Sequence, residues 1–168
     1  LNWQSIDWRL NIAKNFQLKR IELVNNSWEK IFHNELMDEV INVGNTFKEG
    51  IKKSIAKENL LGYEANYAKS LYRLLSKHFE VDFKRKPGEK IDFVNELIDS
   101  HNYYAYGIAG TCLWTLGIPY AFPVLHGETR RGGLVFDLAD IIKDAFLLPL
   151  AFISARDNIE KNKHKKEC

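Results

Sequence analysis

The spacing of the apolar residues most constrains the fold of this chain, because it is helical almost everywhere. In the segment 58–79, apolar side chains recur at steps of three and four residues: Leu60, Leu61, Tyr67, Ala68, Leu71 and Leu75. This spacing places them on one face of an α-helix, whereas a half-buried strand needs strict alternation of apolar and polar residues. No stretch of the sequence shows four clean alternations. The sequence therefore predicts an all-α protein.

Capping and turn residues divide the chain into expected helices. We expect helices over residues 6–25, 28–43, 46–56, 58–79 and 92–116, and from about 134 past Pro149. Ser5 and Asp92 are suitable N-caps, the run 25–27 is expected to interrupt the first helix, and Gly44 to end the second. Loops are expected at 80–90 and 118–133. A bend is predicted near Gly107 and Gly110, and a kink at Pro149.

The composition is that of an ordinary globular protein. Of the 168 residues, 45% are hydrophobic and 27% charged, with 24 Lys and Arg against 22 Asp and Glu. Such a chain can bury about 70% of its unfolded surface, so we expect one helical domain over 1–168 with a flexible basic tail from about 158. Two cysteines without a metal or disulfide pattern and no bilayer-length apolar run favour a cytoplasmic protein. The first residue is Leu1 rather than Met, which suggests that upstream sequence was removed or omitted.

Glu64 departs from the helical pattern because it lies on the same face as Leu60, Ala68 and Leu71. A buried ionised carboxylate is costly unless it has a cation, a hydrogen-bond network or a raised pKa. A functional site and a structural ion pair with a buried Arg or Lys explain it equally well. Because the charge would be poorly solvated, we expect Glu64→Ala to leave the metal-free fold intact or slightly more stable.

Two more carboxylates lie three residues apart in the apolar run 134–142. Asp137 and Asp140 therefore share a helix face, where their repulsion needs a divalent cation or solvent to offset it. The helix dipole explains Asp137 in a first turn better than it explains Asp140. Asp144 extends the row by one turn and, beside Lys143, is predicted to be a surface residue.

His126 lies in a loop rich in proline and glycine, where a packed histidine has little reason to occur. A histidine held by rigid loop neighbours is a candidate site residue, and an exposed histidine without a function is the alternative. Glutamate, histidine and aspartate together suit a hard divalent ion, either Mg²⁺ or Mn²⁺, and the imidazole shifts the preference towards Mn²⁺.

Basic residues near these acids suit a polyanionic ligand. Two arginines follow His126 and a basic loop follows the Glu64 helix, with the candidate DNA contacts Arg130, Arg131, Lys84, Arg85 and Lys86. Cations beside metal-binding acids indicate phosphodiester chemistry, although a solvated loop would explain the lysines by itself. The tyrosines at 103, 104 and 106 are more typical of helix packing than of base stacking.

Three blocks of the sequence carry a resemblance to a known family: LLGYEANYAK at 60–69, LHG at 125–127 and FDLADIIK at 136–143. They resemble, in order and spacing, the catalytic domain of the CRISPR-associated integrase-nucleases that acquire new spacers. Residues 126–137 are most similar to the subtype I-F branch. The resemblance covers about 5–155 and implies a helical catalytic domain with Glu64, His126 and Asp140 as metal ligands, and Asp137 in support or as a further ligand to metal or water.

The resemblance also implies an activity and partners. Members of this family hold Mg²⁺ or Mn²⁺ and activate a phosphate while the 3′-hydroxyl of a prespacer attacks the end of a CRISPR repeat. The same site cleaves branched DNA. The full-length proteins are homodimers that work with a small CRISPR-associated partner, fused to a helicase-nuclease in the I-F branch. Members begin with a β-rich domain that mediates much of the dimerisation, and this chain is expected to lack it.

Two other functions stay open from the residues alone. A helical DNA- or protein-binding module without turnover would keep its DNA affinity after Glu64→Ala, and neither form would cleave. A helical metal phosphohydrolase acting on nucleotides would use similar ligands, although the sequence has no adjacent His-Asp pair.

Overall fold

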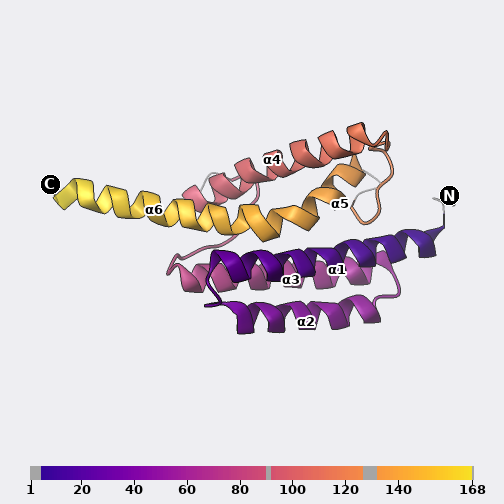
Figure 1. Cartoon of the computed structure of the whole chain (residues 1–168), viewed down its shortest axis with the longest axis horizontal. Coiled ribbons are helices and arrows are strands. Elements are labelled where there is room, and N and C mark those ends of the chain that lie inside the picture. The colour runs from indigo at the N-terminus through magenta and orange to yellow at the C-terminus, as the bar shows by residue number, and fades with distance from the viewer. Residues whose placement is uncertain (1–4, 90–91, 127–131, 168) are drawn as a thin grey trace.

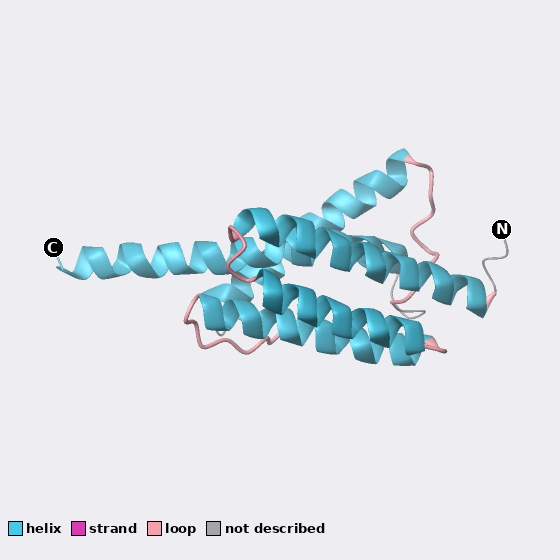
Figure 2. Cartoon of the chain, turned by 60° about the horizontal axis from the view of Figure 1, so that its bottom comes forward, coloured by secondary structure: helices cyan, strands magenta, loops and turns pink. Residues whose placement is uncertain are grey.

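The computed structural model describes residues 5–89, 92–126 and 132–167, and every regular element in these ranges is helical (Figures 1 and 2). The elements are α1 (Ile6–Ile31), α2 (Met37–Lys53), α3 (Lys57–His78), α4 (Phe93–Thr115), α5 (Gly133–Ile142), the π-helical turn η1 (Lys143–Leu147) and α6 (Leu148–Glu167). No strand occurs in these residues, so the all-α prediction is confirmed. None of their helices is long and apolar enough to span a membrane.

The helices form two groups that share one core. Figure 1 shows α1, α2 and α3 side by side below α4, α5 and α6, and α1 connects the groups through its contacts with α5 and η1. The wholly buried side chains of the core come from both groups and include Ile21, Val24, Trp28, Leu60, Leu71, Leu75 and Phe152. Burial of these apolar side chains is the main favourable contribution to folding. Arg20 lies within this core, where α1 faces η1.

The first helix is longer than predicted. It continues through residues 25–27 to Ile31 instead of ending near Asn25. Trp28 is wholly buried, so the packing of α1 favours continuing the helix past its polar residues. The Ser27 hydroxyl donates to the carbonyl oxygen of Leu23, which satisfies it within the helix.

The helices predicted over 28–43 and 46–56 were wrongly divided. Residues 28–31 belong to α1, and α2 runs without a break through Gly44 and Asn45. A Cβ atom on Gly44 would lie 3.0 Å from Cγ2 of Ile21 in α1. This glycine therefore permits the close approach of two helices and does not end one.

The predictions for the next two helices are confirmed. α3 spans nearly the expected residues, and α4 follows the cap at Asp92, whose Oδ1 accepts from the backbone N–H of Asn95 at 2.8 Å. The bend predicted near Gly107 and Gly110 does not interrupt the helix, because α4 runs through both glycines as one continuous α-helix. The loop between these helices, within 80–89, also agrees with the prediction.

The irregularity expected at Pro149 occurs a few residues earlier, in η1. Proline has no N–H, and its ring would clash with the carbonyl of Ala145 in a regular helix. A π turn is a common way for a helix to accommodate such a disruption. The tail expected from about 158 falls in the last turns of α6, which Figure 2 shows extending beyond the bundle; its flexibility stays a prediction.

Candidate metal centre

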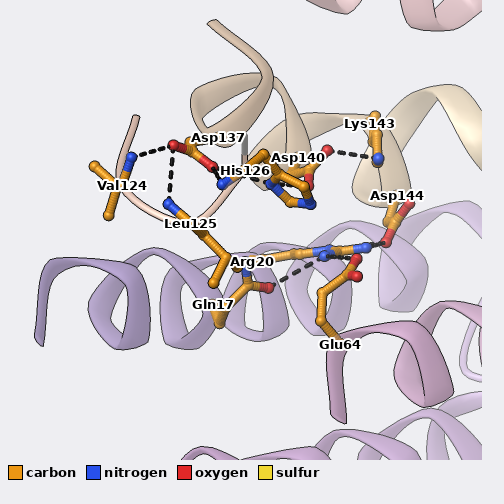
Figure 3. A network of polar contacts seen from close by, with 10 residues as sticks. All are labelled: Gln17, Arg20, Glu64, Val124, Leu125, His126, Asp137, Asp140, Lys143 and Asp144. Atoms are coloured by element: carbon orange, nitrogen blue, oxygen red, sulfur yellow. Dashed lines mark hydrogen bonds and ion pairs between the residues drawn. The ribbon is translucent and has the colours of Figure 1, made fainter. Parts of the chain in front are cut away.

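Arg20 is the centre of a polar network that joins α1, α3 and η1 (Figure 3). Its side chain is wholly buried, and its Nη1 donates to Oε1 of Glu64 at 2.7 Å and to Oε1 of Gln17 at 3.1 Å. Its Nε donates to Oδ2 of Asp144 at 2.8 Å, and its Nη2 donates to the same oxygen. Burial opposes the charge of Arg20, but Asp144, Glu64 and Asp140 outweigh it and raise the pKa of the guanidinium. Arg20 therefore stays charged.

Sequence reasoning missed Arg20, although the pattern contained a signal. The helical steps from Ala13 through Gln17 and Arg20 to Val24 place Arg20 on the apolar face of α1. A buried cation on that face needs a buried acidic partner on another helix, which is what Glu64 offers. Of the two explanations left open for Glu64, the structure has the ion pair with a buried arginine, and a role of Glu64 in a metal site stays a prediction.

The ion pair changes the expected effect of removing Glu64. The side chain is 13% exposed and is the partner of a wholly buried guanidinium, so it is not a lone charge. Truncation of the Glu64 side chain would leave the Arg20 guanidinium with two of its three partners, Asp144 and Gln17. We now expect Glu64→Ala to destabilise the metal-free protein by about 1–3 kcal/mol, which is typical when a buried partner is left underpaired.

The prediction that Asp144 is a surface residue is wrong. Asp144 is only 2% exposed, and its carboxylate pairs with Arg20. Its backbone carbonyl also accepts from Nε1 of Trp28 at 3.0 Å. The prediction rested on the neighbouring Lys143. The regular step of four residues from Asp140 keeps Asp144 on the same buried face, which packs against α1.

Asp137 anchors the loop that carries His126. Its carboxylate accepts from the backbone N–H groups of Val124 at 2.5 Å, Leu125 at 3.1 Å and His126 at 2.8 Å, and Oδ1 lies 3.0 Å from Nδ1 of His126. Gly133 allows this close approach, because a Cβ there would lie 2.7 Å from the carbonyl oxygen of His126. Both oxygens of Asp137 are thus engaged, which favours the supporting role over direct metal binding.

Asp140 faces His126 and Lys143. Its Oδ1 lies 2.5 Å from Nζ of Lys143, and its Oδ2 lies 3.6 Å from Nδ1 of His126. Burial alone would raise the pKa of Asp140, but Lys143, Arg20 and His126 outweigh burial and hold it below its ordinary value. Burial alone would lower the pKa of His126. The hydrogen bond to Asp137 and the negative charges of Asp140, Asp137 and Glu64 together outweigh burial and raise that pKa. Because its own pKa is held low, the Asp140 carboxyl group is ionised.

The three expected ligands come from three separate segments. Figure 3 shows Glu64 of α3, His126 of the loop and Asp140 of α5 gathered around the end of the Arg20 side chain. In this arrangement no three His, Cys, Asp or Glu side chains of the described residues are grouped closely enough to hold an ion. Two of the three expected ligands pair with basic side chains instead, Glu64 with Arg20 and Asp140 with Lys143.

The donor set nevertheless fits a divalent ion. Carboxylate oxygens with one imidazole are ligands suited to Mn²⁺ and Mg²⁺. Four carboxylates, those of Glu64, Asp137, Asp140 and Asp144, meet two basic side chains here, Arg20 and Lys143, so acidic groups outnumber basic ones even if His126 is counted as protonated. Burial of an excess of negative charge is unfavourable, and one divalent cation would neutralise it.

Comparison with known proteins places the chain in a family. No family model matches it. A CRISPR-associated endonuclease Cas1 from Pseudomonas aeruginosa (strain UCBPP-PA14) is 37% identical over 99% of this chain and 54% of its own length. A second one, from Pectobacterium atrosepticum, is 36% identical over 99% of this chain and 53% of its own. The chain belongs to the Cas1 family. It spans about half the length of these curated Cas1 relatives.

The Cas1 fold is found in a solved structure as well. A CAS1 protein from Thermotoga maritima matches with a TM-score of 0.76 over 92% of this chain and 49% of its own, at 19% identity. The resemblance inferred from the three blocks around Glu64, His126 and Asp140 is thereby confirmed as to family and fold. The roles of these residues stay predictions.

The basic residues expected to contact DNA lie in different settings of this Cas1 domain. Arg130 and Arg131 lie outside the described residues. Arg85 is held in place, because its Nη1 donates to Oδ1 of Asn95 at 2.9 Å and its Nη2 pairs with Asp99. Lys84 is exposed, and Nζ of Lys86 lies 3.4 Å from the exposed Glu89. Contact of these residues with DNA stays a prediction.

The tyrosines of α4 do not all pack as predicted. Tyr106 packs edge-on against Phe136, with ring centroids 4.7 Å apart. Tyr103 meets the Tyr106 ring edge-on within α4, with ring centroids 6.2 Å apart, but it is 76% exposed and Tyr104 is 66% exposed, so neither is buried in helix packing. Regular helical spacing could not show that no other element of the described structure covers this side of α4.

Proposed function

We propose that this chain carries the catalytic site of a metal-dependent DNA endonuclease and integrase of CRISPR adaptation that works in the cytoplasm. The observation that carries the proposal is the meeting of Glu64, His126 and Asp140, from α3, a loop and α5, in a half-buried network with excess negative charge. The curated relatives are named CRISPR-associated endonucleases, which supports a nuclease.

Glu64, His126 and Asp140 would hold Mg²⁺ or Mn²⁺. Nδ1 of His126 lies against Asp137, which leaves Nε2 as the nitrogen available to a metal. A carboxylate on the other ring nitrogen orients a histidine ligand and increases its basicity. When bound, the ion would act as a Lewis acid on the scissile phosphate and orient the attacking and leaving oxygens. Asp137 would position His126 by holding its backbone and its ring.

The substrates would be double-stranded and branched DNA, namely a prespacer and the leader end of a CRISPR repeat. In integration, the 3′-hydroxyl of the prespacer would attack the phosphate at the end of the repeat and form a new phosphodiester bond, and the 3′-oxygen of the flanking nucleotide would leave with a proton. In cleavage of branched DNA, water would take the place of the attacking hydroxyl. Arg130, Arg131, Lys84, Arg85 and Lys86 are the proposed phosphate contacts. Basic side chains supply most of the affinity for a DNA backbone.

The partners belong to the whole protein, of which this chain spans about half by the length of its relatives. We propose a homodimer and a small CRISPR-associated partner protein fused to a helicase-nuclease. The similarity of residues 126–137 to the I-F branch supports the fusion.

Cleavage of a branched, half-integrated DNA with Mn²⁺ tests the proposal. Glu64→Gln is the sharpest variant, because glutamine can still accept from Arg20 while it is a poorer metal ligand. His126→Ala is the second, and Glu22→Gln in an exposed pair with Lys19 is the control. Loss of cleavage in the first two alone supports the proposal. Equal cleavage by all forms refutes it, and DNA binding without cleavage by any form favours a binding module.

A further inference from the structure

The polar network contains two basic side chains that are bound very differently. Arg20 is wholly buried and donates to three acceptors, on Glu64, Asp144 and Gln17. Lys143 forms an ion pair with Asp140, and its side chain is 21% exposed. Removing the Arg20 guanidinium from its place would leave several buried groups unpaired, whereas the Lys143 ammonium lies at the edge of the network.

Lys143 occupies one of the two carboxylate oxygens of a proposed metal ligand, Asp140. Its Nζ lies 2.5 Å from Oδ1 of Asp140, one of the three proposed ligands. Mg²⁺ binds carboxylate oxygens at about 2.0–2.1 Å, so an ion on that oxygen and an ammonium at hydrogen-bond distance from it would repel each other strongly. The described residues contain no ready three-ligand group, and two of the proposed ligands, Glu64 and Asp140, are paired with cations.

The flexibility of a lysine makes an exchange feasible. Lys143 follows Asp140 by three residues, so both lie on the same side of the chain where α5 passes into η1. A lysine has four rotatable methylene units and carries a compact charge that water solvates well, whereas the planar fork of an arginine is fixed by its acceptors. The Lys143 ammonium can therefore move towards solvent without opening a cavity, and Arg20 cannot.

We propose that Lys143 is the resident counter-ion of the metal site, which leaves Asp140 when a divalent ion binds, while Arg20 stays paired with Asp144. This inference rests on the proposed function, since it concerns the same site. Lys143 neutralises Asp140 in the metal-free protein and competes with the metal for it. After displacement its ammonium remains tethered beside the site, where an anionic substrate would meet it. Lys143 is thus a positioning residue, and metal binding creates a free positive charge next to the metal.

Titration with Mn²⁺ alone tests the exchange without relying on activity. The variants are Lys143→Met, which removes the charge, and Lys143→Arg, which keeps it. Lys52→Met is the matched control, because Lys52 also pairs with a carboxylate three residues away, at 2.6 Å, but is 72% exposed. Calorimetry gives the Mn²⁺ dissociation constant, and circular dichroism at 222 nm follows folding with and without Mn²⁺.

We expect Lys143→Met to bind Mn²⁺ about tenfold more tightly, which corresponds to the loss of one partly screened charge interaction, and to melt at a lower temperature without metal. Lys143→Arg and Lys52→Met should show no gain in affinity. Lys143→Met could be unfolded without metal. In that case, the inference is equally supported if the variant folds at Mn²⁺ concentrations too low to bind the parent chain, Lys143→Arg or Lys52→Met.

The outcomes separate this inference from the function on which it rests. If the parent chain binds Mn²⁺ and Lys143→Met binds it equally or more weakly, Lys143 does not compete and the inference is refuted, while the metal site stands. If neither binds Mn²⁺, the proposed metal site is refuted and the inference with it. Binding by Lys143→Met alone would support the inference in its strongest form.

Discussion

Replacing Asp144 tests the network most directly, because its carboxylate is buried and accepts from two nitrogens of the wholly buried Arg20. Asp144→Asn keeps the shape of the side chain and removes its charge. The wholly buried Arg20 would keep Glu64 and Gln17, but it would lose the carboxylate that accepts from both its Nε and its Nη2. Breaking a buried ion pair on one side typically costs about 3–5 kcal/mol. We expect about 3 kcal/mol, because one carboxylate partner remains.

For a chain of this length, each kcal/mol of stability shifts the melting temperature by about 2–4 °C. Asp144→Asn should therefore melt about 6–12 °C below the parent chain. Thermal and urea unfolding in EDTA, followed by circular dichroism at 222 nm, measure the change. Asp157→Asn is the control, since Asp157 is half-exposed and lies 3.6 Å from Arg156, and exposed pairs contribute little. A loss of stability no larger than that of the control would refute the buried role of Asp144.

Three further predictions concern the loop, the helix packing and the metal. Asp137→Asn should weaken Mn²⁺ binding about tenfold or more, as loss of a partner that orients a metal ligand typically does, and should speed amide exchange at His126, measured by hydrogen exchange. Gly50→Ala should destabilise α2, since its Cβ would lie 2.4 Å from Cδ1 of Tyr63, whereas Gly107→Ala, with open space, should stabilise α4 by up to about 1 kcal/mol in urea unfolding. Mn²⁺ at a hundred times its dissociation constant should add about 2.7 kcal/mol of stability, which EDTA should remove; an unchanged melting temperature would contradict this.

Local signals were sufficient for α3 and α4. The apolar steps of α3 and the Asp92 side chain at the start of α4 act within a few residues, so the sequence alone predicts them. They were insufficient between residues 25 and 45. There the boundaries depend on the burial of Trp28 and on the contact of Gly44 with Ile21, which bring distant residues together.

Some residues of the candidate site can also be predicted from local sequence pattern, and others cannot. Glu64 and His126 are recognisable as candidates because a charge on an apolar face and a histidine in a rigid loop are anomalies of local pattern. The pairing of Asp144 is not recognisable from local pattern, since its partner Arg20 lies in α1 and meets it only through the packing of η1 against α1.

By itself, the sequence determined the helical class, the Cas1 family through three short blocks, and Glu64, His126 and Asp140 as the candidate ligands. Only the tertiary structure decided how the acids are paired. Arg20 meets Glu64 across 44 positions of sequence and Asp144 across 124. The strength of such pairs depends on burial and on the direction of each side chain in the folded core, and neither property is contained in the local spacing of residues.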